Sequence, residues 1–192
     1  GAATVPQVTA TSDQEAEATA DANSVNAGAG AGVAVALNVD GQRVEAEVGG
    51  AITAPGLSIT AQRGGDGVKD FRAEAISGAG AADIEAAGAF ALNLSGDPDD
   101  LADADAGSRH LVRIRDGAVV DLAPGADLLH SVTYADVFRA VADAQPAGGG
   151  VVGIGPSVAV NATTHSTLAE IGRARIFDAD DVTVRATGTH TT

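Results

Sequence analysis

Short segments in which apolar and polar residues alternate recur along the whole chain, and glycine-rich turns separate them. In residues 15–22, for example, alanine alternates with acidic residues and threonine. A period of two predicts a strand with one buried face, so the chain is expected to be all-β. The other segments of this kind are 33–39, 44–48, 51–53, 57–62, 71–77, 84–94, 110–115, 118–122, 128–134, 138–144, 151–161, 167–171, 174–177 and 182–186.

One of these strands returns twice. Residues 33–38 read Val-Ala-Val-Ala-Leu-Asn, residues 89–93 read Ala-Phe-Ala-Leu-Asn, and residues 157–161 read Ser-Val-Ala-Val-Asn. A segment that recurs along a chain predicts similar units that stack on one another. We expect one repeat domain over residues 1–192, in which Asn38, Asn93 and Asn161 occupy equivalent places along one axis. Its units are 14–68, 69–135 and 136–192, and the second carries an acidic insertion at 96–107.

Residues 127–144 also fit the spacing of a helix. Leu128, Val132, Ala135 and Phe138 lie three or four positions apart, as on one helix face. The aligned segments of the other two units do not fit this spacing, and consistency among the units favours strand. We therefore predict strand structure for the whole segment.

Residues 151–184 carry a resemblance to known proteins. They contain Val-Val-Gly-Ile-Gly-Pro-Ser-Val-Ala-Val-Asn-Ala-Thr-Thr, then Ala-Glu-Ile-Gly and Asp-Asp-Val-Thr-Val. This pattern, shared by all three units, resembles the repeats of very large bacterial surface adhesins of the filamentous-haemagglutinin-like or autotransporter-passenger type. The resemblance implies a β-solenoid fold, an extracellular or cell-surface location, and a structural or adhesive role.

A possible hairpin shapes the expected architecture. Asp40-Gly41 stands between two alternating apolar segments, which is a strong hairpin signal and predicts antiparallel pairing. The units are also much longer than one turn of a simple β-helix. We therefore expect a β-solenoid or β-helix of three stacked wide repeats with hairpins, and a β-sandwich built from the same hairpins is the alternative.

The composition indicates a thin interior. Aromatic residues make up 3% of the chain, glycine accounts for 25 of 192 residues, and alanine dominates the apolar class. Few large side chains are therefore available to fill a core. Inward-facing alanines at 16, 18, 73 and 75 indicate layers closer than the roughly 10 Å usual for packed sheets. The large apolar side chains expected to point inward are Leu37, Phe90, Leu92, Val160 and Ile171.

The charge restricts the classes of partner. A formal net charge of −15 disfavours nucleic acid and anionic membrane surfaces, because no basic stripe exists to neutralise phosphates. No run of eighteen apolar residues is present, so membrane insertion is not expected. The absence of cysteine excludes disulfides and thiolate chemistry without fixing the compartment.

The acidic insertion is the candidate metal site. Ca²⁺ prefers six to eight oxygen ligands, which a cluster of carboxylates could supply. The spacing matches neither an EF-hand loop nor the glycine-rich calcium-binding nonapeptide, so a solvated loop or short capped helix is the alternative. The candidate calcium ligands are Asp97, Asp99, Asp100, Asp103 and Asp105.

No catalytic or cofactor-binding residue is predicted. His110, His130, His165 and His190 fall at different places within the units, without the spacing of a zinc site. Histidine neighbours such as Ser131 would point to the opposite face of a strand, which argues against a catalytic serine. Gly-x-Gly patterns do not open helices here, so dinucleotide binding is not supported.

The function expected from the resemblance is that of a structural and adhesive repeat segment, which attaches to a surface or acts as a stalk and is not an enzyme. Its partner would be a protein or glycan receptor on a host or other surface. Two other classes stay open: a carbohydrate-acting β-helix lyase or hydrolase with Arg109, Arg113 and Asp105 along a groove, and a calcium-binding rigid spacer. The sequence also leaves open whether terminal strands pair end to end between copies.

Overall fold

The computed structural model describes residues 4–25, 29–65, 68–80, 84–96, 108–146 and 152–192, and these residues form strands and turns without a helix. None of them forms a helix long and apolar enough to cross a membrane. The strands are β1 (Gln7–Ser12), β2 (Ala16–Val25), β3 (Ala29–Asp40), β4 (Arg43–Val48), β5 (Ala51–Ala54), β6 (Leu57–Arg63), β7 (Lys69–Gly80), β8 (Ile84–Ser95), β9 (Ser108–Ile114), β10 (Val119–Pro146), β11 (Val152–Ile154), β12 (Ser157–Thr163), β13 (His165–Ile171) and β14 (Arg175–Thr191).

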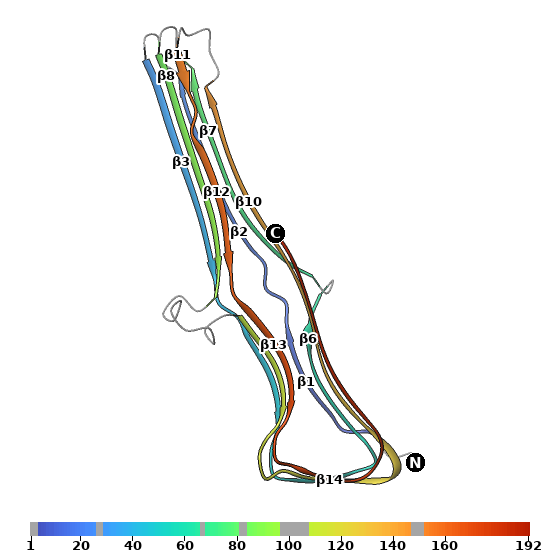
Figure 1. The fold of residues 1–192 in the computed structure, drawn as a ribbon. Helices are drawn as coiled ribbons and strands as arrows, with labels where there is room; N and C mark the ends of the chain where they lie inside the picture. Colours follow the sequence, from blue (N-terminus) through green and yellow to red (C-terminus); the bar gives the residue numbers. More distant parts are fainter. Residues whose placement is uncertain (1–3, 26–28, 66–67, 81–83, 97–107, 147–151) are drawn as a thin grey trace.

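The strands form two long walls that face each other (Figure 1). One wall is a sheet of seven strands, β1, β2, β5, β6, β7, β10 and β14. The other wall contains two sheets that follow one another along the molecule, the first made of β3, β8, β11 and β12 and the second of β4, β9 and β13. Each strand pairs with strands one layer away rather than with its neighbour in sequence. The chain therefore runs along one wall, turns, and returns along the other.

The register confirms the predicted stacking of the repeated strand. In β3, β8 and β12, Asn38 pairs with Asn93, and Asn93 pairs with Asn161. The opposite wall keeps the same order, because Ala16 pairs with Phe71, and Phe71 pairs with Phe138. Equivalent residues of the three copies thus lie above one another, and each layer satisfies the backbone groups of the next.

The predicted hairpin at Asp40-Gly41 is wrong. Strands β3 and β4, on either side of it, do not pair with each other, since β3 pairs with β8 and β4 pairs with β9. All pairings among the described strands are parallel. The chain continues in the same direction through this site, because pairing between layers supplies the hydrogen bonds that a hairpin would have made. The β-sandwich alternative depended on the same antiparallel hairpins.

Strand structure over residues 127–144 is confirmed, since they lie within β10. This strand pairs in turn with β5, β6 and β7 of the preceding layer and with β14 of the following one. Its register shifts between Asp121 and Leu128, and Gly125 there has φ +79°. A left-handed glycine at this position lets the strand bend at the end of the molecule.

The alanine-lined interior predicted from the composition is also present. Alanines of β3, β7 and β8 pack into one buried cluster, and Ala73, Ala75 and Ala91 have no exposed surface. At the far end of this cluster a Cβ atom at Gly32 would overlap the backbone carbonyl oxygen of Gly78 on the opposite wall. The two walls therefore approach closely at Gly32, and alanine fills most of the interior between them, with Ser77 and Glu85 also buried there.

The predicted direction of the large apolar side chains in the repeated strand is wrong. In β3 the exposed residues alternate with buried ones, and Leu37 is 54% exposed whereas Ala36 is 3% exposed. Phe90 and Val160 are likewise exposed, and Leu92 is half-buried. The narrow interior accepts the alanines of these strands and forces the larger residues outward. Ile171 does face inward, where it packs against the second core cluster.

This second cluster fills the other half of the molecule with larger aliphatic side chains. It lies between β4 and β9 on one wall and β6 and β10 on the other. Leu57, Ile59, Ile114 and Leu128 are almost completely buried in it. The interior thus changes along the molecule from an alanine-lined half to an aliphatic half.

Candidate metal centre

A belt of polar side chains separates the two halves of the interior. The belt lies at the junctions between consecutive strands: β3 and β4, β8 and β9, and β6 and β7. All its members are buried except His165, which is partly buried as a residue although its side chain is only 4% exposed. Asp40, Gln42, Arg63, Ser95, His110, Tyr134, Asp136 and His165 form this polar belt.

The stacked asparagines Asn38, Asn93 and Asn161 lie next to the belt, on the side of the alanine-lined half of the interior. Asn93 Nδ2 lies 3.2 Å from the carbonyl oxygen of Phe71, 2.6 Å from that of Arg139 and 3.1 Å from Oδ1 of Asn161. Asn38 Nδ2 donates in the same way to the carbonyl oxygen of Ala16, at 2.9 Å. The repeated asparagine therefore ties the two walls together through main-chain acceptors.

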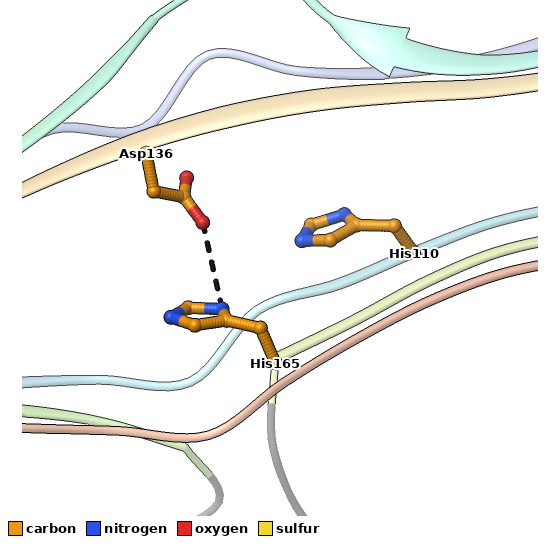
Figure 2. A group of neighbouring side chains, drawn as sticks. All are labelled: His110, Asp136 and His165. Carbon is orange, nitrogen blue, oxygen red and sulfur yellow. Dashed lines mark ion pairs between the residues drawn. The ribbon is translucent and has the colours of Figure 1, made fainter. Parts of the chain in front are cut away.

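Asp136 is the acidic centre of the belt, and its side chain has no exposed surface. Its Oδ2 atom lies 3.5 Å from Nδ1 of His165 and 3.3 Å from Nδ1 of His190. His110 adds a third imidazole, because one ligand atom each of His110, Asp136 and His165 lie within 4.8 Å of one another. Figure 2 shows Asp136 extending from one wall toward His110 and His165 on the other.

Parallel stacking explains this convergence. His190 of β14 pairs with Asp136 of β10, so these two side chains are neighbours on one wall. His110 of β9 pairs with Thr167 of β13, two positions beyond His165, and thus lies close to it on the other wall. The ladder pair Asp136–His190 on one wall thus faces His110 and His165, two residues apart in register, on the other wall.

Aromatic contacts and burial fix the neighbouring side chains. The rings of His165 and His190 stack with centroids 4.5 Å apart, and Tyr134 stacks on His110. Burial raises the pKa of Tyr134, so the phenol stays protonated. Burial also lowers the pKa of His190 from its usual value, which favours a neutral imidazole.

One fixed positive charge lies beside the cluster. Arg63 has a nearly buried side chain, and its Nη2 atom donates to the carbonyl oxygens of Gln14 and Val68, each at 3.0 Å. Its Nη1 atom lies 3.5 Å from the Tyr134 hydroxyl. These main-chain acceptors hold the guanidinium in place beside the phenol.

The chemistry of this group is that of a ligand set. Imidazole nitrogens and a carboxylate oxygen are the donors that zinc and related divalent ions prefer. Catalysis would require access for a substrate, but the side chains of Asp136 and His165 are buried between the walls. The arrangement therefore suits a bound ion better than a turnover site.

The candidate calcium ligands from the sequence, Asp97, Asp99, Asp100, Asp103 and Asp105, lie outside the described residues. The calcium site stays a prediction.

The proposed lyase arginines lie in rows of alternating charge on the outer surface. Arg113 forms ion pairs with Glu170 at 2.9 Å and with Glu47 at 3.7 Å. It lines an open depression of about 520 Å³ together with both glutamates. Arg109 lies 3.9 Å from Glu45, and Asp105 is outside the described residues. Carboxylates of adjacent layers thus neutralise both arginines.

The histidine cluster was missed from the sequence. The four histidines differ in their position within the units, which argued against a shared site. One signal was available, because Asp136 and His190 are separated by nearly one repeat length and would be ladder neighbours in a parallel stack. The contribution of His110 and His165 depends on the two walls facing each other, which no spacing in the sequence reveals.

His130 provides a pH-dependent prediction outside the cluster. Its side chain is buried, Nε2 lies 3.0 Å from the carbonyl oxygen of Val112, and burial lowers its pKa from 6.5. The unfolded chain therefore takes up a proton below about pH 6.5 that the folded chain resists, so stability should fall as the pH falls. We expect the decrease in Tm from pH 7.5 to 5.5 to be smaller for His130→Gln. An equal decrease in both proteins would contradict the prediction.

Comparison of this chain with protein-family models, curated proteins and solved structures finds no match.

Proposed function

We propose that this chain is a β-solenoid segment of a secreted or surface-displayed bacterial protein, with a structural and adhesive role. The support for the solenoid is the in-register parallel stacking of equivalent strands, such as Asn38 on Asn93 on Asn161. In such a stack each layer contacts only its neighbours, and stability grows with every added layer. An elongated, stiff segment of this kind is suited to holding an attachment surface away from a cell.

The outward face of β3, β8 and β12 carries the adhesive part of the proposal. Along β3 its exposed positions are Ala29, Ala31, Val33, Val35, Leu37 and Val39. Each of these positions belongs to a row of paired residues that crosses the neighbouring strands. In one such row Val35 pairs with Phe90, and Phe90 pairs with Val158. The described outward positions of this face hold no charged residue, although the chain has a net charge of −15. Contiguous exposed apolar surface of this kind marks interaction sites on soluble proteins.

The chemistry of this face favours an apolar partner surface. Without charged groups it cannot form ion pairs, and its described outward positions offer aliphatic side chains and one aromatic side chain, Phe90, for contact. A protein receptor with a flat apolar patch therefore fits better than a charged glycan. Strong negative charge elsewhere would repel a second copy except where two such faces meet.

Attachment of the chain to an alkyl-coated surface tests this proposal. The triple variant Val35→Thr, Phe90→Thr, Val158→Thr removes one apolar row and keeps β-branched or strand-compatible side chains at exposed positions. We expect attachment of beads coated with the variant to fall at least about tenfold, because central apolar residues dominate contact energies. Light scattering of both proteins would show whether the face instead pairs two copies.

Two exposed aliphatic residues of the opposite wall supply a matched control. Leu129 and Val141 of β10 are each 41% exposed, and their replacement by threonine removes apolar surface from a different face. This variant should attach as the original chain does. Equal attachment by the triple variant and the original chain would refute the adhesive role and leave only that of a spacer.

A further inference from the structure

The cluster around Asp136 draws its side chains from four strands in two walls. Asp136 and His190 come from β10 and β14, whereas His110 and His165 come from β9 and β13. Three of the four are almost completely enclosed, and His190 at the edge has a side chain that is 34% exposed. Residues that are 80 positions apart in the chain thus converge at one place in the interior.

The distances within the cluster agree with those around a tetrahedral ion. Ligand atoms at 2.0–2.1 Å from zinc lie about 3.3–3.4 Å from one another when the arrangement is tetrahedral. The Nδ1 atoms of His190 and His165 lie 3.3 and 3.5 Å from Oδ2 of Asp136. His110, Asp136 and His165 each offer one ligand atom within 4.8 Å of the other two, and His190 joins this group through its 3.3 Å approach to Asp136.

We propose that Asp136, His110, His165 and His190 bind one divalent transition-metal ion, with zinc as the expected occupant. Three imidazoles and one carboxylate match the ligand preference of zinc, whereas calcium and magnesium prefer oxygen ligands. Four protein ligands leave no open position, so the ion has a structural role. It joins the two walls at the polar belt, where apolar packing is interrupted.

The charge of the cluster agrees with this occupant. Burial of a carboxylate is costly unless an opposite charge lies close to it. The Nδ1 atoms of His165 and His190 lie 3.5 and 3.3 Å from Oδ2 of Asp136, and the guanidinium of Arg63 donates to the carbonyl oxygens of Gln14 and Val68. A divalent cation held by Asp136 and the three histidines adds positive charge directly beside the buried carboxylate.

Zinc titration of the chelator-treated full chain tests the proposal. We expect one zinc ion per chain by elemental analysis after dialysis, and a Tm that rises with each tenfold increase in free zinc. Calcium and magnesium at the same concentrations should leave Tm unchanged. Cobalt as a probe should give the intense visible absorption of a tetrahedral site.

The variants are chosen so that a folding defect can be recognised. His190→Gln changes the most exposed member and should keep the strand circular dichroism while lowering zinc affinity at least about 100-fold, since loss of even an outer partner costs 10–100-fold. Asp136→Asn should abolish binding. His130→Gln replaces an equally buried histidine outside the cluster and should retain one zinc ion per chain.

Two outcomes would overturn the proposal. One is a folded original chain that retains no stoichiometric zinc and shows no change in Tm, which would leave the cluster as an ion pair between a carboxylate and a protonated histidine. The other is equal zinc affinity in the original chain and His190→Gln, which would place the ion elsewhere. Neither outcome bears on the adhesive face, which lies on the outer surface of β3, β8 and β12.

Discussion

Replacement of Ala91 by leucine should lower the free energy of unfolding by about 3 kcal/mol, the upper end of the usual cost of overpacking a core. Ala91 is completely buried in β8, within a cluster made entirely of alanine side chains. The opposite wall presents Ala73 and Ala75, which are also completely buried, so three additional carbon atoms have no space. Larger side chains can be accommodated only if the walls separate, and separation would strain the stacked strands on both sides. Chemical denaturation followed by circular dichroism measures the change.

Ala86→Leu is the matched control for this experiment. Ala86 lies in the same strand and is exposed on the outward face. The same increase in volume there should change the free energy of unfolding by less than about 0.5 kcal/mol. If both variants were equally stable, the close approach of the two walls would be wrong.

Replacement of Asn93 by leucine should destabilise the chain by about 3 kcal/mol. The Asn93 side chain is 1% exposed, and its amide donates to acceptors on both the opposite wall and the next layer. Leucine has a similar size but no donor, so the carbonyl oxygens of Phe71 and Arg139 would lose a partner. An unsatisfied buried acceptor costs about 1–3 kcal/mol, and two main-chain acceptors are affected in addition to the Asn161 side chain.

Gln62→Leu serves as the control for the loss of an amide. Gln62 is exposed on β6, and solvent can replace any hydrogen bond that its amide makes. This variant should unfold at nearly the same denaturant concentration as the original chain. An Asn93→Leu variant as stable as Gln62→Leu would show that the asparagine row does not hold the walls together.

The fold was predictable where the physical rule is local. Alternation in residues 15–22 and 57–62 marks half-buried strands, and the structure has β2 and β6 there. The repeated asparagine predicted equivalent places for Asn38, Asn93 and Asn161, because a fixed side-chain environment in each layer requires the same residue. The register of β3, β8 and β12 confirms this.

The direction of side chains was not predictable by the same means. Alternation shows that Leu37 and Ala36 point to opposite faces but does not say which face is inside. The usual rule buries the larger residue, and the structure does the reverse. The spacing between walls decides this, and that spacing depends on glycine and alanine in strands far apart in the sequence, such as Gly32 and Ala75.

The hairpin at Asp40-Gly41 illustrates the same limit. The dipeptide permits a tight turn, but pairing energy decides whether the turn forms. In this molecule β3 and β4 each find a parallel partner in the next layer, so the chain continues without reversing. Competition between local and interlayer pairing depends on whole strands rather than on two residues.

By itself the sequence determined that the described part of the chain is made of strands, that the repeated asparagine recurs in register, and that part of the interior is lined with alanine. These properties follow from periodicity and composition, which depend only on each residue and its neighbours in the sequence. The tertiary structure alone decided which face is buried and brought Asp136 together with His110 and His165. The physical reason is that these contacts form between two opposing walls. Residues that meet there have no fixed separation along the chain.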